Sequence, residues 1–253
     1  MGDAIVIPAE VARALREARQ VVALTGAGIS AESGVPTFRD AQTGLWAKYD
    51  PQELATPQSF RRNPKLVWDW YAWRRELVAA AEPNPGHFAL AEIERRVPQF
   101  TLITQNVDSL HQKAGNIAVI ELHGNISRIK CYEEDKIVDH WQEPDGDGLP
   151  RCPRCGGMLR PDVVWFGEML PAAALQQAIN ASRSADFFLT IGTSGIVQPA
   201  ASLPFEAIEN GAIAVEINPS ETSLSAWMHH ELRGPSGVIL PALIAATWPE
   251  YIV

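Results

Sequence analysis

Short apolar runs alternate with helix-length segments along most of the chain. Each run is bounded by polar residues or by glycine, as expected for a buried strand of a parallel sheet. Strands that alternate with helices in this way predict a parallel sheet with helices on both faces. The pattern therefore predicts an α/β protein with a Rossmann-like sheet. The predicted strands cover residues 21–24, 100–103, 118–122, 186–191 and 212–217.

Two stretches depart from this alternation and predict a smaller domain inserted into the first. Residues 45–81 are rich in tryptophan and have helical character, and residues 129–160 contain all three cysteines. We predict a Rossmann-like domain that consists of residues 1–44, 82–128 and 161–253. The predicted small domain combines the helical insert with a second insert that is similar to a zinc ribbon.

Composition narrows the class of protein. The chain has 253 residues, which is long enough for one sizeable core, and 46% hydrophobic with 20% charged residues is the balance of an ordinary globular protein. One compact enzyme is the default expectation for a chain of this kind. The net charge of -9 and the scattered basic residues argue against nucleic acid as a partner. We expect no membrane anchor or secretory leader, because the chain shows neither apolar pattern. Three cysteines are too few for a disulfide scaffold, so we expect a cytoplasmic protein.

The first predicted strand runs directly into a glycine turn. Gly26, Ala27 and Gly28 begin a G-x-G-x-x-A pattern that ends at Ala31. Glycines in this position let the backbone approach a pyrophosphate, so the turn is a candidate dinucleotide site. The acidic residue that binds the ribose in dehydrogenases, about 20 residues further on, is not evident. A tight turn without a ligand is the alternative.

Polar residues follow the second predicted strand. Asn106 and Asp108 alternate around Val107, so their side chains would point the same way in an extended backbone. Ligands bind at the carboxyl ends of the strands in such sheets, which makes both residues candidates for ligand binding. A turn capped by asparagine and aspartate is the structural alternative.

Further motifs follow in a fixed order after the glycine turn. They are GVPTFRD (residues 34–40), TQNVD (104–108), His111, His123-Gly124, PDVVWFGE (161–168), GTS (192–194) and Ile217-Asn218. Together these motifs resemble the sirtuin family, over almost the whole chain. The resemblance implies an enzyme that uses NAD as co-substrate to remove acyl groups from protein lysines. Its products would be nicotinamide, O-acyl-ADP-ribose and free lysine.

The resemblance assigns the central chemical step to His123. A ribose hydroxyl must lose its proton when it takes the acyl group, and histidine, with an ordinary pKa of about 6.5, suits this role. By the same resemblance, Asn106 and Asp108 hold the nicotinamide amide and the ribose. Gln105 and Val107 complete this part of the cofactor site. A histidine that only caps the preceding strand is the alternative.

The remaining cofactor contacts also follow from the resemblance. Phe38 would cover the nicotinamide cavity and exclude water, and Arg39 would contact phosphate or ribose oxygens. The turn Gly192-Thr193-Ser194 would hold phosphate or ribose, and Asn218 would contact the ribose on the adenine side. Turn chemistry at strand ends is the alternative for each of them.

A second segment resembles the part of the family that binds the substrate peptide. Val164, Trp165, Phe166 and Gly167 would pair with the peptide backbone, which gives affinity with little sequence preference. The alternative is that Trp165 and Phe166 are core residues.

The helical insert carries candidates for acyl recognition. Tyr71 and Arg74 lie three residues apart on one helix face and would reach the same point. A guanidinium grips a carboxylate through two parallel hydrogen bonds, so the pair suits an acyl group that ends in a carboxylate. The spacing also resembles the sirtuin branch that removes succinyl, malonyl and glutaryl groups; a solvated helix face is the alternative. A neighbouring apolar stripe is predicted to pack the small domain and consists of Leu66, Trp70, Trp73 and Leu77.

An incomplete zinc site lies in the second insert. Cys152 and Cys155 form a C-x2-C pair, whereas the matching position after Cys131 is occupied by Glu134. The family commonly has four thiolates at this place, and oxygen or imidazole ligands also bind zinc. We predict a structural zinc ion, with a metal-free module as the alternative. The candidates for the fourth ligand are Glu134, Asp135 and His140.

Other uses of the scaffold remain open. A mono-ADP-ribosyltransferase would use the same NAD cleavage, a plain deacetylase would lack the acidic preference, and an NAD sensor would leave the cofactor unchanged. His123 favours deacylation over ADP-ribosyl transfer, and the incomplete ribose motif argues against a dehydrogenase. We expect acyl-lysine proteins or peptides as substrates, and the sequence does not fix the oligomeric state.

Overall fold

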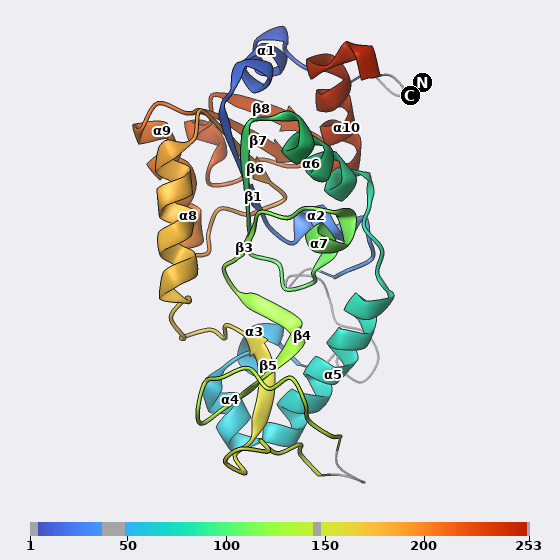
Figure 1. The fold of residues 1–253 in the computed structure, drawn as a ribbon, viewed down its shortest axis with the longest axis vertical. Helices are drawn as coiled ribbons and strands as arrows, with labels where there is room; N and C mark the ends of the chain where they lie inside the picture. Colours follow the sequence, from blue (N-terminus) through green and yellow to red (C-terminus); the bar gives the residue numbers. More distant parts are fainter. Residues whose placement is uncertain (1–4, 37–48, 144–147, 252–253) are drawn as a thin grey trace.

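The computed structural model describes residues 5–36, 49–143 and 148–251. These residues form two lobes, one above the other in Figure 1. The larger lobe contains a six-stranded sheet, and the smaller lobe contains a two-stranded sheet beside a group of helices.

The six strands of the larger sheet are parallel and have the order β3-β2-β1-β6-β7-β8. The chain builds outward from β1 to one edge and later returns beside β1 to build the other half. The loops after β1 and β6 therefore diverge, which creates the switch point where open α/β sheets bind ligands. The strands are β1 (Gln20–Thr25), β2 (Gln99–Thr104), β3 (Val119–Glu121), β6 (Phe187–Ile191), β7 (Ile213–Asn218) and β8 (His230–Arg233).

Helices cover both faces of this sheet, as Figure 1 shows. Val21 and Ala23 of β1 pack in one core with α6 and α10, whereas Val22 and Leu24 pack in a second core with α8 and α9. Successive residues of a strand face opposite sides, so a strand covered on both faces reads as an uninterrupted apolar run. The helices are α1 (Ala9–Glu17), α2 (Gly28–Ala31), α6 (Pro85–Arg96), α7 (Leu110–Ala114), α8 (Ala172–Ser184), α9 (Leu203–Glu209) and α10 (Ser236–Thr247).

The smaller lobe combines three helices with an antiparallel strand pair. Asp50, Thr56 and Asn63 begin the three helices, because each side chain accepts a main-chain N–H of the first turn. A proline follows each of these caps, where its missing N–H costs no helical hydrogen bond. The elements are α3 (Pro51–Leu54), α4 (Pro57–Arg62), α5 (Pro64–Ala80), β4 (Gly124–Cys131) and β5 (Leu159–Val163).

The predicted fold class is confirmed, since all five predicted apolar runs lie in strands of the parallel sheet. β8 was not predicted, because Leu232 is its one buried residue and an edge strand of this kind leaves no apolar run. The predicted domain boundaries at residues 128 and 160 fall within β4 and β5, and the division into domains stays a prediction. Within the described parts of the chain, no helix is long and apolar enough to cross a lipid bilayer.

The buried face of α5 differs from the predicted stripe. Trp70 is buried as predicted, but Leu66 and Trp73 are only partly buried and Leu77 is 37% exposed. Leu66 and Trp73 still pack against the core of the smaller lobe, so the predicted stripe fails only at Leu77. Apolar and aromatic residues surround this helix, so spacing alone does not single out its most buried face. The face that α5 buries includes Val67, Tyr71, Arg74 and Val78.

Candidate active site

The turns that follow β1 and β6 touch each other at the switch point of the sheet. Gly28 donates its N–H to the carbonyl oxygen of Gly192 at 2.8 Å. A Cβ atom on Gly28 would lie 2.7 Å from the Cα of Gly192, and one on Gly26 would lie 2.8 Å from the oxygen of Gly192. The glycine pattern is therefore required by the contact of two backbones, independently of any ligand.

The other residues of the predicted glycine turn and lid lie beside this contact or outside the described residues. Ala27 precedes α2, and Ala31 is the last residue of that helix. Phe38 and Arg39 lie outside the described residues, so their predicted contacts with the cofactor stay predictions.

Asn106 and Asp108 follow β2 and converge on one hydroxyl group. Asn106 donates from Nδ2 to Oγ of Ser30 at 3.0 Å, and Ser30 donates from Oγ to Oδ2 of Asp108 at 2.7 Å. Burial raises the pKa of Asp108, and hydrogen bonds from Leu110 and Ser30 partly offset the rise. Val107 packs on the core of the smaller lobe. The structure thus brings the two predicted polar residues together on a partner, Ser30, that the sequence interpretation did not name.

Two buried histidines adjoin this cluster. His87 accepts the N–H of Asn84 at Nδ1, at 3.3 Å, and its Nε2 lies 3.4 Å from Oγ of Ser30. Nε2 of His111 lies 3.0 Å from Oγ1 of Thr25. Burial lowers the pKa of His87 to about 4 and the pKa of His111 well below its ordinary value. Sequence reasoning missed His87, because Asn84 and the following proline indicate a helix start and not a buried polar group.

His123 lies between β3 and β4, where the chain crosses from the larger lobe to the smaller one. Its Nδ1 is 2.9 Å from the carbonyl oxygen of Gln105. A carbonyl oxygen only accepts, so Nδ1 carries the hydrogen and Nε2 keeps the lone pair of a base. Burial lowers the pKa of His123, and the bond to Gln105 opposes this shift in part. The geometry is that of a neutral imidazole with one nitrogen committed and the other ready to accept a proton.

A row of hydrogen bonds links the ends of β2, β6 and β7. Gln105 donates from Nε2 to Oγ1 of Thr193 at 3.0 Å, and Asn218 donates from Nδ2 to the main-chain oxygen of Thr193 at 3.1 Å. The main-chain oxygen of Ser194 accepts from Oγ of Ser223 at 3.3 Å. Three strand ends that were predicted separately as cofactor contacts are therefore one connected row.

The segment after β5, residues 164–167, connects His123 to the smaller lobe. Val164 donates its N–H to the carbonyl oxygen of His123 at 2.9 Å. Trp165 is 1% exposed, whereas Phe166 is 43% exposed. Gly167 has a φ of 87°, a conformation that favours glycine. The alternative of a core residue therefore applies to Trp165 and not to Phe166.

Tyr71 and Arg74 of α5 lie in the interior of the smaller lobe. They are 1% and 5% exposed, which rules out the alternative of a solvated helix face. The hydroxyl oxygen of Tyr71 accepts the indole N–H of Trp165 at 3.0 Å, and this bond does not use the hydroxyl hydrogen. Burial lowers the pKa of Arg74, but a guanidinium remains charged at neutral pH.

Three cysteines and one glutamate come together in the smaller lobe. Their ligand atoms lie within 4.8 Å of one another, and the residues are Cys131, Glu134, Cys152 and Cys155. The Sγ atoms of Cys131 and Cys155 are 3.5 Å apart, near the roughly 3.8 Å expected for two thiolates on tetrahedral zinc. This donor set fits a structural zinc ion.

The turn that contains the C-x2-C pair has a regular backbone pattern. Cys152 donates its N–H to the oxygen of Gly157, and Gly156 donates back to the oxygen of Cys152, both at 2.8 Å. Gly156 has a φ of 73°, and the N–H of Gly157 lies 3.4 Å from Sγ of Cys155. N–H groups aimed at sulfur stabilise thiolate ligands.

The turn after Cys131 repeats this pattern. Cys131 donates to the oxygen of Lys136 at 2.9 Å, and Asp135 donates back to the oxygen of Cys131 at 3.0 Å. Asp135 has a φ of 52°, in the left-handed region that Gly156 occupies in the other turn. Glu134 therefore takes the place in this turn that Cys155 takes in the other.

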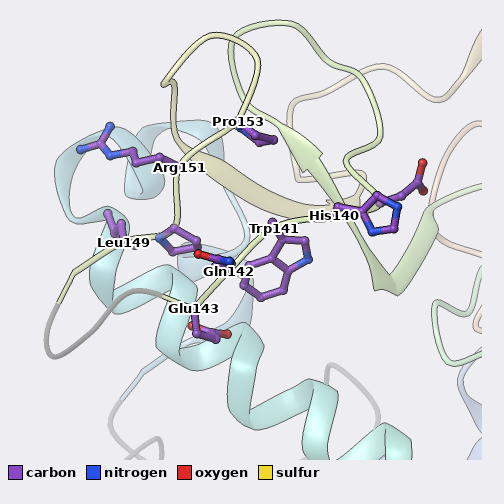
Figure 2. Close-up of a pocket in the computed structure, with 9 residues that line it drawn as sticks. His140, Trp141, Gln142, Glu143, Leu149, Arg151 and Pro153 are labelled. Carbon is purple, nitrogen blue, oxygen red and sulfur yellow. The ribbon is translucent and has the colours of Figure 1, made fainter.

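The other two candidates for the fourth ligand lie elsewhere. The side chain of Asp135 is 78% exposed and pairs with Lys130 at 2.7 Å. His140 lines a separate cavity of about 700 Å³ together with Trp141 and other residues, as Figure 2 shows. Among the predicted candidates, the structure brings Glu134 to the thiols.

The fold and the site define an α/β protein of the class that binds a dinucleotide at the switch point of a parallel sheet. Residues 26–199 match the Sir2 family, and the chain belongs to that family. It is 54% identical to an NAD-dependent protein deacylase of Aquifex aeolicus, over 86% of this chain and 92% of the relative. It is 50% identical to an NAD-dependent protein deacylase of Pyrococcus abyssi, over 93% of this chain and 96% of the relative.

Solved structures agree with this assignment. A Sir2 homologue in complex with NAD has a TM-score of 0.91 and 44% identity, with coverage of 99% of this chain and 97% of the other. A Sir2 protein bound to acetylated peptide has a TM-score of 0.83 and 33% identity, with coverage of 93% and 96%. The family predicted from the motifs is confirmed.

Proposed function

We propose that this chain is an NAD-dependent protein-lysine deacylase that prefers acyl groups ending in a carboxylate. Family membership and relatives named NAD-dependent protein deacylase support the deacylase activity. The Sir2 homologue in complex with NAD supports NAD as the co-substrate. When bound, NAD supplies the ADP-ribose that accepts the acyl group.

His123 acts as the general base in this account. Its Nε2 keeps a lone pair because Nδ1 is committed to the carbonyl oxygen of Gln105. With NAD bound, Nε2 would accept the proton of the ribose hydroxyl that takes the acyl group. Asn106 and Asp108, held by Ser30, orient the nicotinamide end of the cofactor.

The acidic acyl preference rests on one observation, the burial of Tyr71 and Arg74 in the smaller lobe. A guanidinium shielded from water attracts a carboxylate more strongly than an exposed one does. Tyr71 already accepts from Trp165, which leaves its hydroxyl hydrogen to donate to the acyl carboxylate. The two side chains together would recognise a succinyl, malonyl or glutaryl group.

The substrates are acyl-lysine proteins or peptides. The relative bound to acetylated peptide supports this class of substrate. We infer that the segment from Val164 to Gly167 pairs with the peptide backbone, because it follows an antiparallel strand and includes the half-exposed Phe166. Such main-chain pairing would let many protein sequences bind.

We infer that Cys131, Glu134, Cys152 and Cys155 hold a structural zinc ion. Four protein ligands complete a tetrahedral site and leave no open position for a substrate. The zinc would join β4 to the turn before β5. Free thiols persist in a reducing compartment, so we also propose that the protein acts in the cytoplasm.

An acyl-peptide panel tests this function. Purified protein is incubated with NAD and peptides carrying acetyl-, succinyl-, malonyl- or glutaryl-lysine, and the products are measured by mass spectrometry. We expect nicotinamide, free lysine and O-acyl-ADP-ribose, with the highest kcat/KM for the acidic groups. A higher value for acetyl-lysine would leave a plain deacetylase. Protein that carries ADP-ribose would indicate a transferase. Formation of NADH would indicate a dehydrogenase, and unchanged NAD would indicate a sensor.

A further inference from the structure

An ion pair between a buried arginine and a partly buried glutamate lies at the base of the segment after β5. Arg160, the second residue of β5, donates from Nη1 and Nη2 to the two carboxylate oxygens of Glu168 at 2.6 and 2.9 Å. Arg160 is 3% exposed. Burial would raise the pKa of Glu168, but the hydrogen bonds from Arg160 and Trp165 outweigh it and the pKa is lowered. The carboxylate of Glu168 is therefore charged at neutral pH.

The same ion pair closes the segment into a loop. Glu168 also accepts the N–H of Trp165 at 2.8 Å, and its own N–H returns to the carbonyl oxygen of Trp165 at 2.9 Å. Arg160 donates to the carbonyl oxygen of Val163 at 2.7 Å, and its guanidinium stacks 3.3 Å from the centre of the Trp165 ring. The ion pair thus holds both ends of residues 164–167, which we call the 164–167 loop.

The 164–167 loop contacts both halves of the active site. At one end, Val164 donates to the carbonyl oxygen of His123, the proposed base. One residue further on, Trp165 donates to the hydroxyl of Tyr71, the proposed acyl contact. A shift of the loop would therefore move the peptide-binding backbone and the acyl-binding hydroxyl together.

We propose that the ion pair of Arg160 and Glu168 positions the 164–167 loop for the acyl-lysine substrate and, through Trp165, fixes the hydroxyl of Tyr71. This inference rests on the proposed function, in which the loop binds the peptide. The two side chains are positioning residues, because they act on the substrate through the loop and not by contact. A bidentate pair suits this role, since it fixes direction as well as distance.

The test uses Glu168→Gln, which keeps the size of the side chain and an acceptor for the Trp165 N–H but loses the charge. Arg160→Lys is the second variant, because it keeps the charge but loses the bidentate grip and the stacking. The matched control is Glu206→Gln, which breaks the exposed pair of Arg183 and Glu206, 2.7 Å, between α8 and α9. Melting temperatures verify that all variants fold.

Two readouts are compared. Hydrogen exchange without substrate should be faster at the amides of the 164–167 loop in both ion-pair variants and unchanged in the control. With substrates, we expect KM for acyl-lysine peptides to rise about 10-fold or more while KM for NAD changes little. Unchanged loop exchange, or faster exchange with an unchanged peptide KM, would overturn the proposal, because the pair would then serve folding alone.

Hydrogen exchange of the loop and binding of the peptide can test this inference even if the proposed function fails. If the wild-type protein removes no acyl group, the proposed function fails, and calorimetric binding of an acyl-lysine peptide replaces KM as the second readout. Peptide binding that weakens in both ion-pair variants would still support positioning; binding that does not weaken would overturn it.

Trp165→Phe tests the link to Tyr71. The phenyl ring keeps most of the packing but has no N–H for the hydroxyl of Tyr71. We expect kcat/KM to fall more for succinyl-lysine than for acetyl-lysine peptides. An equal fall for both peptides would contradict the link between the loop and the acyl contact.

Discussion

A main-chain oxygen, and not a carboxylate, holds the ring of His123. A carboxylate partner would raise the pKa of the imidazole, whereas burial lowers it here. At any given pH a larger fraction of this ring is therefore neutral than of an exposed histidine. Orientation comes from Gln105 and neutrality from burial, so the two requirements of a general base are met by different neighbours.

Replacing this base separates turnover from cofactor binding. We expect His123→Ala to lower kcat by roughly 100- to 10,000-fold, because a general base acts in the transition state. NAD affinity, measured by calorimetry, should change little, since the contacts of Asn106, Asp108 and Thr193 remain. A variant that keeps more than half of the wild-type turnover would contradict the role of His123.

The buried imidazole of His87 makes stability depend on pH. Its folded-state pKa is about 4, against an ordinary value of 6.5, so the unfolded chain binds a proton that the folded chain does not. The stability contributed by neutral His87 is complete above pH 6.5 and is lost as the pH falls toward 4, by about 3 kcal/mol. We expect His87→Gln to reduce this loss of unfolding free energy.

Chemical denaturation at pH 7 and pH 5 measures the effect. The matched control is His140→Gln, which changes an exposed histidine at the cavity of Figure 2. The same pH dependence in His87→Gln and in wild-type protein would show that His87 is not the group responsible.

Among the structural elements, the two turns that carry the metal ligands show why a glutamate can replace a cysteine at position 134. Both turns have the same pattern of backbone hydrogen bonds. In each turn, the residue after the second ligand has a left-handed backbone conformation. The backbone therefore presents the Glu134 side chain as it presents Cys155. Arg154 pairs with the Glu134 carboxylate at 2.9 Å and orients it further.

Zinc content tests this cluster. We expect about one zinc ion per chain in protein purified without chelator, and none after Cys152→Ser together with Cys155→Ser. Glu134→Cys should hold zinc more tightly against a competing chelator, because a fourth thiolate replaces a carboxylate. Asp135→Asn is the control and should not change zinc content. A wild-type protein without zinc would show that the module folds on packing alone.

The sequence predicts elements best where one physical requirement decides the pattern. Strands buried on both faces read as apolar runs, so β1, β2, β6 and β7 were found. β8 buries only Leu232, so its sequence contains no apolar run. The turns that carry the metal ligands lie between β4 and β5, and neither of these strands has an apolar run that predicts it. The stripe on α5 was predicted correctly except at Leu77, because tertiary packing and not periodicity decides which face is most deeply buried.

The sequence motifs predicted only part of the candidate site. The sequence pointed to Asn106, Asp108 and His123, and the structure brings them to the same end of the sheet. It did not point to Ser30 or His87. The contacts of Ser30 with His87 and with Asp108 depend on how α2 and α6 pack, and these helices are far apart in the sequence. The glycines of the first turn were explained by a ligand, whereas the structure shows that backbone contact requires them.

At the scale of the whole molecule, the site is shared between the two lobes. The row of hydrogen bonds at the ends of β2, β6 and β7 lies in the larger lobe, and α5 with Tyr71 and Arg74 lies in the smaller lobe. His123 lies between β3 and β4, where the chain crosses from one lobe to the other. This division separates two properties. The larger lobe would set the reaction common to the family, and the smaller lobe would set which acyl group is accepted.

Steady-state kinetics of wild-type protein and of Arg74→Met measure the acyl preference proposed for the smaller lobe. Methionine keeps the apolar part of the side chain and removes the charge, so the contact with an acyl carboxylate should be lost. The contact of the guanidinium with the Trp70 ring is lost as well, and this loss should affect both peptides equally. A charge-assisted contact is worth about 1.5 to 3 kcal/mol, so KM for a succinyl-lysine peptide should rise roughly 10- to 150-fold. KM for the matched acetyl-lysine peptide should change little. Equal losses on both peptides, or a wild-type enzyme that prefers acetyl-lysine, would contradict the account.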